Sequence, residues 1–243
     1  MHIHIISIFP DIFQSFLETS LIQKAQEKKI LKFHFVNPRS FCPDKHQKVD
    51  DTIYGGGAGL LMKALPAIQA VEKIIKSIKT KKTPSRFHVS TFPPFHILLL
   101  SPAKKVFTQK EAHALSKVQH LIFVCTRYEG IDYRFEQYMK KKYPKNFEKI
   151  SIGQFVTLGG EVPAMVMIEA ITRLIPGVIK EESSRQDESY NIKEHMNNLE
   201  YPQYTHPEAV MGMKVPKILL SGHHKKIEEW RKSKTRMVKN RQK

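Results

Sequence analysis

Three apolar runs in this chain each end in a short polar or glycine-rich loop, and this feature limits its fold most strongly. Continuous apolar runs are typical of strands buried on both faces, as in a parallel sheet. In such sheets ligands bind beside the carboxyl ends of the strands. The sequence therefore predicts an α/β fold whose three loops form a ligand site. The runs are residues 97–100, 121–125 and 150–152, and the loops are residues 101–102, 126–130 and 153–161.

The rest of the first 180 residues supplies further strands and the helices that would cover the sheet. Pro163 suits the first turn of a helix that is apolar almost all round, which predicts that this helix is buried. A basic, proline-containing stretch at residues 80–96 is expected to be a surface insertion. The expected elements are strands within 1–10 and over 30–36, a helix capped by Asp11, and helices over 64–79 and 163–174.

The charge of the chain favours an acidic partner. It has 40 basic and 23 acidic residues, a net charge of +17, and nucleic acid is the commonest polyanion that such a protein meets. Lys225, Lys226 and Arg231 belong to a basic cluster near the C-terminus. We expect this cluster to contact phosphates, and a solvated helix face is the alternative.

Composition also predicts the domain organisation. We expect a main α/β domain over 1–180, a flexible polar linker over 181–198 and a small C-terminal domain over 199–243.

The two cysteines, Cys42 and Cys125, form no disulfide framework and fit a reducing cytoplasm. No segment reaches the roughly 18 apolar residues of a membrane helix, and the histidines show no metal-ligand spacing.

Three polar or glycine-rich motifs have both structural and functional interpretations. The glycines at 55–59 suggest a tight loop with positive φ, while Asp50 and Tyr54 beside them leave a binding role open. The loop at 127–130 is either an ion-paired turn or a site that recognises a base or ribose. The glycines of the third loop either form simple bends or allow a ligand to approach the backbone closely.

These motifs, taken together and in order, resemble a known family: the bacterial tRNA (guanine-N1)-methyltransferases that modify guanosine 37, next to the anticodon. The resemblance covers nearly the whole length. The matching segments are residues 6–10, 49–51, 54–57, 100–102, 127–132, 151–153, 159–165, 173–178, 201–205 and 215–231.

The resemblance implies a SPOUT-type fold, in which the parallel sheet carries a C-terminal trefoil knot and a small helical C-terminal domain follows. It implies a cytoplasmic homodimer whose active sites are shared between the chains, with S-adenosylmethionine as cofactor, tRNA as substrate and a possible requirement for Mg²⁺. Asp50, Tyr54 and Arg127 would contact the tRNA. The cofactor-binding residues implied are Leu100, Ser101, Pro102, Tyr128, Glu129, Gly130, Ser151, Ile152, Gly153, Val156, Gly159, Gly160 and Pro163.

The resemblance also implies catalytic roles. Glu188 matches the position of the base that removes the proton from guanine N1, and its neighbour Asp187 is the alternative. From composition alone, both are expected to be solvated carboxylates. Arg173 matches the residue that stabilises the charge developing on O6. The sequence departs from the family pattern at two places. Thr126 stands before Arg127 where the family has glycine, and the C-terminal domain is expected to be shorter than that of the family.

Two alternative functions remain. The altered base position and the short C-terminal domain would also suit an RNA-binding protein that keeps the fold with impaired catalysis. A methyltransferase of the same fold that acts on another RNA is the second alternative.

Overall fold

A computed structural model of the protein describes most of the chain, and the described part forms two compact units. The units are Met1–Lys180 and Glu181–Lys243. The described residues are 1–80, 94–179, 189–190 and 198–237. Most of the expected linker, including Asp187 and Glu188, lies outside these ranges.

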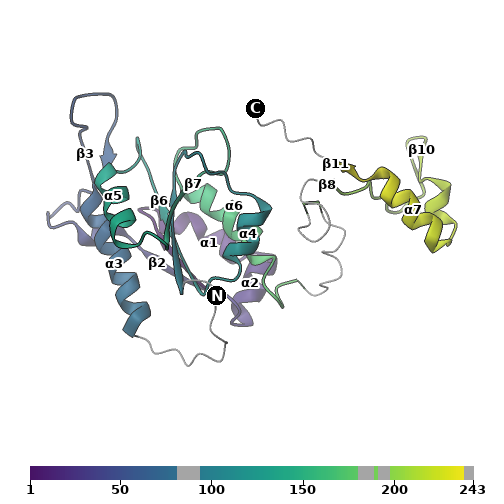
Figure 1. Cartoon of the computed structure of the whole chain (residues 1–243), viewed down its shortest axis with the longest axis horizontal. Coiled ribbons are helices and arrows are strands. Elements are labelled where there is room, and N and C mark those ends of the chain that lie inside the picture. The colour runs from purple at the N-terminus through teal and green to yellow at the C-terminus, as the bar shows by residue number, and fades with distance from the viewer. Residues whose placement is uncertain (81–93, 180–188, 191–197, 238–243) are drawn as a thin grey trace. The chain divides into compact units, whose positions relative to one another are not determined.

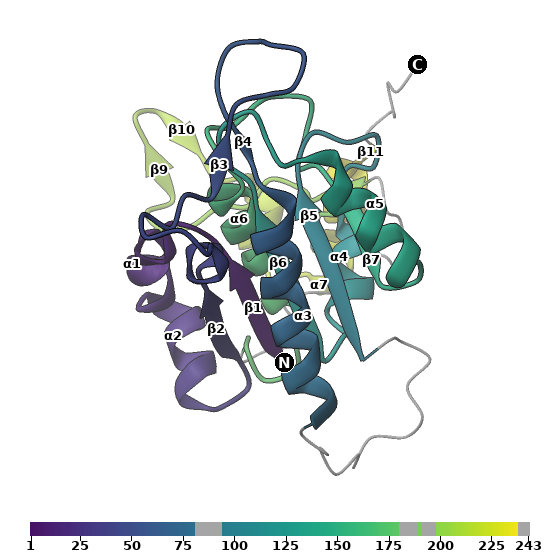
Figure 2. The same ribbon diagram turned by 90° about the vertical axis from the view of Figure 1, so that its left-hand side faces the viewer.

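The first unit is built around a five-stranded sheet in which all neighbouring strands are parallel (Figures 1 and 2). The strand order is β2-β1-β6-β5-β7. The predicted α/β fold with a parallel sheet is thus confirmed. The strands are β1 (His2–Ile6), β2 (Lys32–Val36), β5 (Phe95–Leu100), β6 (His120–Cys125) and β7 (Phe147–Ile150).

Helices cover both faces of the sheet and enclose a hydrophobic core on each side. Along β1, Ile3 and Ile5 face one core and Ile6 faces the other, because side chains alternate along a strand. The first core is closed by η1 (Pro10–Phe13), α1 (Gln14–Leu17), α2 (Ser20–Glu27), α4 (Gln109–Leu115) and α6 (Glu161–Thr172). The second core is closed by α3 (Ala64–Thr80) and α5 (Tyr133–Lys142). The connection between β2 and α3 contains η2 (Pro38–Phe41) and a hairpin of β3 (Asp50–Asp51) and β4 (Leu61–Met62).

Three sequence expectations need correction. The strand expected at 150–152 is instead β7 at Phe147–Ile150. Its middle residues, Glu148 and Lys149, are polar and half-buried, which an edge strand tolerates, and they therefore interrupted the apolar pattern used to find the strand. Asp11 caps no helix, since the fixed φ of Pro10 already starts the 3-10 turn. The expected basic insertion is shorter than 80–96: Thr80 ends α3 and Phe95 begins β5, while residues 81–93 lie outside the described part.

Helix α6 is buried on one side only, contrary to the expectation of a fully buried helix. Met167 and Ile168 are 0% exposed and pack in the first core, whereas Val162 and Val166 are 53% and 47% exposed. The apolar sequence of α6 therefore serves two surfaces, the core and an outer face.

The second unit is small and basic. It contains short antiparallel strand pairs, a 3-10 turn and one helix, and Tyr201 and Tyr204 contact Trp230 at ring-centroid distances of 6.5 and 6.3 Å. Its elements are β8 (Asn198–Leu199), β9 (Ala209–Val210), β10 (Met213–Lys214), η4 (Lys217–Leu220), α7 (His224–Lys234) and β11 (Arg236–Met237). No helix in the described ranges of either unit is long and apolar enough to span a lipid bilayer.

Candidate active site

A cavity of about 150 Å³ lies at the carboxyl ends of β5, β6 and β7, where the three predicted loops meet. The strands are parallel neighbours or next neighbours, so their loops leave the sheet on the same edge. The register pairs Leu100 with Cys125 and with Ile150, which brings the three strand ends level. The sheet therefore places the three loops around one cavity, as the sequence predicts.

Backbone hydrogen bonds join the segment after the first loop to Ser151, which lies between β7 and the third loop. Ser151 donates to the carbonyl of Lys105 at 3.0 Å, and Phe107 donates to the carbonyl of Ser151 at 2.8 Å. The Ser151 hydroxyl in turn donates to the carbonyl of Gly153 at 2.7 Å. The start of the third loop is thus fixed against the segment that follows β5.

The second loop is held from the opposite side by the glycine-containing hairpin. The backbone of Glu129 donates to Leu60 at 3.0 Å, and that of Met62 donates to Gly130 at 3.0 Å. A Cβ on Gly59 would lie 2.7 Å from Glu129 Cγ, so only glycine lets the hairpin approach this closely. The predicted loop with positive φ is confirmed, with φ values of +85°, +82°, +131° and +86° at Gly55, Gly56, Gly57 and Gly59.

Twelve of the thirteen residues predicted to bind a cofactor line this cavity, and Gly153 is the exception. The structure adds Thr126, Ile150, Phe155 and Thr157 to the lining. Thr126, Phe155 and Thr157 lie within the predicted loops, so taking each loop as a whole would have found them, whereas Ile150 belongs to the strand run that precedes the third loop. Thr126, a departure from the family pattern, donates from its hydroxyl to the carbonyl of Leu100 at 3.0 Å and thereby joins two strand ends.

A buried acidic side chain that the sequence did not single out lies next to the residues that line the cavity. Glu161 is 0% exposed, and its Oε2 lies 2.8 Å from Nε of Arg127. The guanidinium of Arg127 also lies over the ring of Phe9, 4.9 Å from its centroid. Arg127 is thus ion-paired, but its partner is Glu161 of the third loop, and the expected ion-paired turn within residues 127–130 is not what the structure shows. The interpretation of Arg127 as a tRNA contact stays a prediction.

Comparison with known proteins identifies the family. The family described as tRNA (guanine-1)-methyltransferase TrmD matches the chain over residues 1–243. The chain belongs to this family. It is 43% identical to a tRNA (guanine-N(1)-)-methyltransferase of Carboxydothermus hydrogenoformans over 97% of this chain and 83% of that protein. It is 42% identical to one from Metamycoplasma arthritidis over 99% and 94%, and 40% identical to one from Bacillus velezensis over 95% and 86%.

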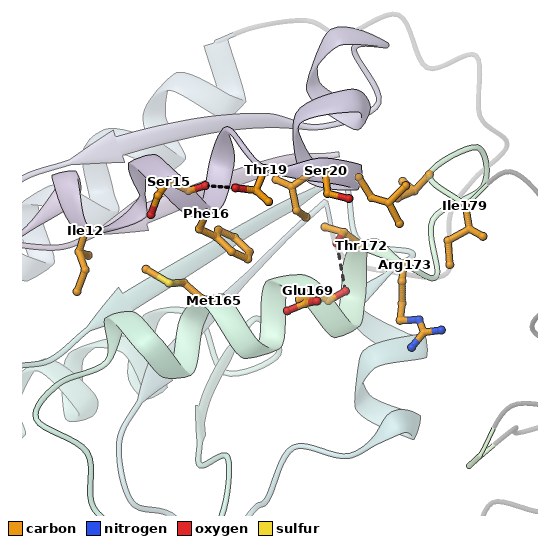
Figure 3. Close-up of a pocket in the computed structure, with 13 residues that line it drawn as sticks. Ile12, Ser15, Phe16, Thr19, Ser20, Met165, Glu169, Thr172, Arg173 and Ile179 are labelled. Atoms are coloured by element: carbon orange, nitrogen blue, oxygen red, sulfur yellow. Dashed lines mark hydrogen bonds between the residues drawn. The ribbon is translucent and has the colours of Figure 1, made fainter. Parts of the chain in front are cut away.

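Arg173, the family's predicted charge-stabilising residue, lies in a second concave region. This groove of about 540 Å³ runs between α6 and the segment from η1 to α2 (Figure 3). In Figure 3, Phe16 and Met165 lie close together across the groove, and the side chain of Arg173 extends away from them at the end of α6. Arg173 is an exposed residue at the C-cap of α6.

The residues predicted to contact tRNA lie in different surroundings. Asp50 is 7% exposed in the short β3–β4 pair, whereas Tyr54 is 96% exposed on the hairpin loop. Lys225 and Lys226 are exposed on α7 of the second unit. Arg231 lies on the same helix, with its guanidinium 5.1 Å from the ring centroid of Tyr201. Their roles in RNA binding stay predictions.

Other ionisable groups near the cavity do not form a nucleophile or a metal centre. Cys125 is buried at the end of β6, and burial raises the pKa of its thiol well above the usual value, so the thiol stays protonated. Among the described residues, no three His, Cys, Asp or Glu side chains converge on a possible metal position.

Proposed function

We propose that this protein transfers a methyl group from S-adenosylmethionine to N1 of guanosine 37 in tRNA. The observation that carries the proposal is the cavity at the ends of β5, β6 and β7 in a chain that matches the methyltransferase family from end to end. The net charge of +17 supports a polyanionic substrate.

The residues around the cavity fit S-adenosylmethionine. Gly130 has a φ of +117°, and a Cβ there would point into open space, which leaves room for a ligand against the backbone. Apolar side chains such as Leu100 and Ile152 suit a flat purine, and the carboxylate of Glu129 supplies a polar partner. We assign the binding of the cofactor to the three loops. When bound, the cofactor supplies an activated methyl carbon for transfer to a nucleophile.

The protein's own residues would prepare guanine for attack. N1 of neutral guanine carries a proton, and we assign its removal to Glu188, with Asp187 as the alternative base. As N1 loses its proton, negative charge develops on O6, and we assign its stabilisation to Arg173. The exposed position of Arg173 on α6 supports a role toward a ligand that arrives from outside the unit.

We also propose a homodimer with shared active sites. Val162 and Val166 on α6 and Ile12 on η1 are 53%, 47% and 41% exposed, and the third loop exposes Val156 and Leu158 to 86% and 91%. Exposed apolar side chains gathered on neighbouring elements are typical of protein interfaces. Their position beside the groove and the cavity supports an active site completed by a second copy of the chain.

Finer features of the fold are proposals as well. A trefoil knot is supported by the path after β7, which pairs at Ser151 with the segment following β5 and returns at Gly160 to the end of β6. We assign tRNA binding to the small C-terminal domain, whose helix α7 carries exposed basic residues. A tRNA substrate supports a cytoplasmic location for the enzyme. The methylation assay, run with and without Mg²⁺, tests whether the reaction requires this ion.

A methylation assay with defined transcripts tests the proposal. Purified protein is incubated with S-adenosylmethionine and a tRNA transcript that has guanosine at positions 36 and 37, with and without Mg²⁺. Mass analysis and a primer-extension stop should both locate 1-methylguanosine at position 37. A transcript with adenosine at position 37 is the matched control and should remain unmodified.

The same assay separates the alternatives. RNA binding without methyl transfer would support the RNA-binding protein with impaired catalysis. Methylation at another position, or equal methylation of the control transcript, would support a methyltransferase with a different RNA substrate. Either result would overturn the proposed function.

A further inference from the structure

One buried carboxylate joins three separate segments of the cavity wall. Glu161 is the first residue of α6 and is 0% exposed. Ser7, which follows β1, donates from its hydroxyl to Oε1 of Glu161 at 2.6 Å. Arg127, which follows β6, places its Nε 2.8 Å from Oε2 of the same carboxylate. The two oxygens of Glu161 thus hold the ends of β1 and β6 against the start of α6.

These contacts lie directly behind the surface that faces the cavity. Thr126 and Tyr128, on either side of Arg127, line the cavity, and so does Gly160, which precedes Glu161. Arg127 and Glu161 themselves are not among the lining residues. The ion pair therefore connects the second and third loops without touching the space where a cofactor would bind.

The packing around the ion pair leaves little room for adjustment. An added Cβ on Gly159 would lie 2.4 Å from Nε of Arg127 and 2.8 Å from Oε2 of Glu161. The side chain of Arg127 is 21% exposed and is further held by its contact with the ring of Phe9. A shift of either charged group would therefore displace the loop that carries it.

The attraction between the guanidinium of Arg127 and the carboxylate of Glu161 comes from their opposite charges more than from an aligned hydrogen bond. Nε of Arg127 and Oε2 of Glu161 are close, but the N–H is not aligned for a hydrogen bond. The N-terminus of a helix favours a negative side chain, which is the position that Glu161 occupies in α6. Removing one member of a buried ion pair leaves the other charge uncompensated, which strongly disfavours the original arrangement.

We propose that Glu161 is a positioning residue: through Arg127 and Ser7 it holds the second and third loops in the arrangement that binds S-adenosylmethionine. This inference rests on the proposed function. It predicts that the charge of Glu161 sets cofactor affinity although the residue does not contact the cofactor.

Titration calorimetry with S-adenosylmethionine, together with steady-state kinetics on tRNA, tests the inference. Glu161→Gln keeps the side-chain volume and removes the charge. Because displaced loops lose contacts with the cofactor, we expect at least about a tenfold rise in Kd and in KM for S-adenosylmethionine, with a smaller change in kcat at saturation. An unchanged Kd would overturn the inference.

Glu136→Gln is the matched control for the general loss of a buried carboxylate. Glu136 on α5 is 8% exposed and pairs with Lys140 at 2.6 Å, but it does not line the cavity. We expect Glu136→Gln to lower the melting temperature without changing the Kd for the cofactor. Equal rises in Kd for the two variants would assign the effect to general destabilisation and overturn the inference.

A double-mutant cycle tests whether Glu161 acts through Arg127. Arg127→Gln should also raise the Kd, and the Arg127→Gln, Glu161→Gln pair should be no worse than the weaker-binding single variant, because groups in contact do not act independently. Additive losses would overturn the role of the pair.

Ser7→Ala tests the inference if Glu161→Gln fails to fold. This variant keeps both charges and should still raise the Kd about threefold, because Glu161 loses the hydrogen bond from Ser7. An unchanged Kd would overturn the inference. Wild-type protein that does not bind S-adenosylmethionine would instead overturn the proposed function.

Discussion

The backbone amide of Gly160 donates a hydrogen bond of 2.8 Å to the carbonyl of Thr126, and this contact joins the third loop to the end of β6. A Cβ at Gly160 would lie 2.8 Å from Cα of Cys125 and 2.9 Å from the amide nitrogen of Thr126. These are backbone atoms at the end of the central strand β6 and of the residue after it, and they cannot move aside as a flexible side chain can. The close approach of the two segments therefore requires glycine at this position.

Gly160→Ala should consequently disrupt cofactor binding. We expect the third loop to be displaced and the Kd for S-adenosylmethionine to rise by about a hundredfold, as measured by titration calorimetry. Gly153→Ala is the comparison, because the three atoms nearest to a Cβ there all belong to the ring of Phe155, which is 58% exposed and can turn away. A loss from Gly160→Ala no larger than that from Gly153→Ala would contradict this account.

The apolar runs predicted the parallel sheet and the meeting of its three loops, and the family resemblance supplied most of the lining residues. Residues 97–100 and 121–125 are continuous apolar runs, and such runs are characteristic of strands in the middle of a parallel sheet. The carboxyl-end rule then placed Ser101 and Tyr128 near each other although they lie far apart in the chain. The prediction succeeded here because one general property of parallel sheets determines which loops meet.

Other contacts depend on tertiary packing that no local pattern encodes. The pairing of Arg127 with Glu161 exists only because the chain returns from β7 to the end of β6. The sequence therefore left open whether the 127–130 loop is an ion-paired turn or a binding site, and it did not indicate Glu161 as the partner of Arg127. The contact of His4 with His120 likewise depends on the register between β1 and β6. Asp187 and Glu188 lie outside the described residues, so their roles still rest on the family resemblance alone.

Arg173→Ala should remove most methyl transfer and leave cofactor binding intact. Loss of one group that stabilises charge in a transition state typically lowers kcat by about 10²–10³-fold. Arg173 is exposed on the groove side of α6 and is not among the residues that line the cofactor cavity, so calorimetry with S-adenosylmethionine should show an unchanged Kd. Arg173→Lys should recover part of the activity. Activity of the alanine variant within a few-fold of wild type would show that another group stabilises the charge.

Glu188→Gln should cost far more activity than Asp187→Asn, because Glu188 matches the family's base position. General-base catalysis typically contributes about 10²–10⁴-fold, and single-turnover methylation of tRNA measures this step directly. Both substitutions keep the size of the side chain and remove its ability to accept the proton. Equal losses, or a larger loss from Asp187→Asn, would move the base to Asp187.

Four stacked histidines should make the protein less stable in acid. His2 Nδ1 lies 3.0 Å from His34 Nε2, and His4 Nε2 lies 3.1 Å from His120 Nδ1, so each pair needs one neutral ring as acceptor. The pKa of His2 is lowered to about 4, first because the ring is partly buried and then because of the positive charge of His120, His34, the N-terminal amine and Lys32. A lowered pKa means that folding favours the neutral ring. Its contribution to stability is therefore complete above the ordinary pKa near 6.5 and is lost as the pH falls from there toward 4.

Thermal unfolding at pH 7.5 and pH 5 measures this effect. We expect His2 to account for a loss on the order of 1 kcal/mol, less than the full shift in pKa implies because the ring is partly exposed. His2→Gln should reduce the difference between the two pH values. His46→Gln, at an exposed histidine of the loop before β3, is the control and should leave that difference unchanged. Identical pH dependence in wild type and His2→Gln would exclude this contribution.

Val166→Glu should separate the proposed dimer into monomers and abolish methyl transfer. Val166 is 47% exposed on the outer face of α6, beside the groove that contains Arg173, and burying a carboxylate against an apolar partner surface is unfavourable. Light scattering coupled to gel filtration measures the mass of the particle.

Leu65→Glu is the matched control, because Leu65 is 60% exposed on α3, a helix that covers the opposite face of the sheet. If the particle is a dimer, we expect this control to leave its mass unchanged. Wild-type protein that is active as a monomer would refute shared active sites, and an active dimeric Val166→Glu variant would place the interface elsewhere.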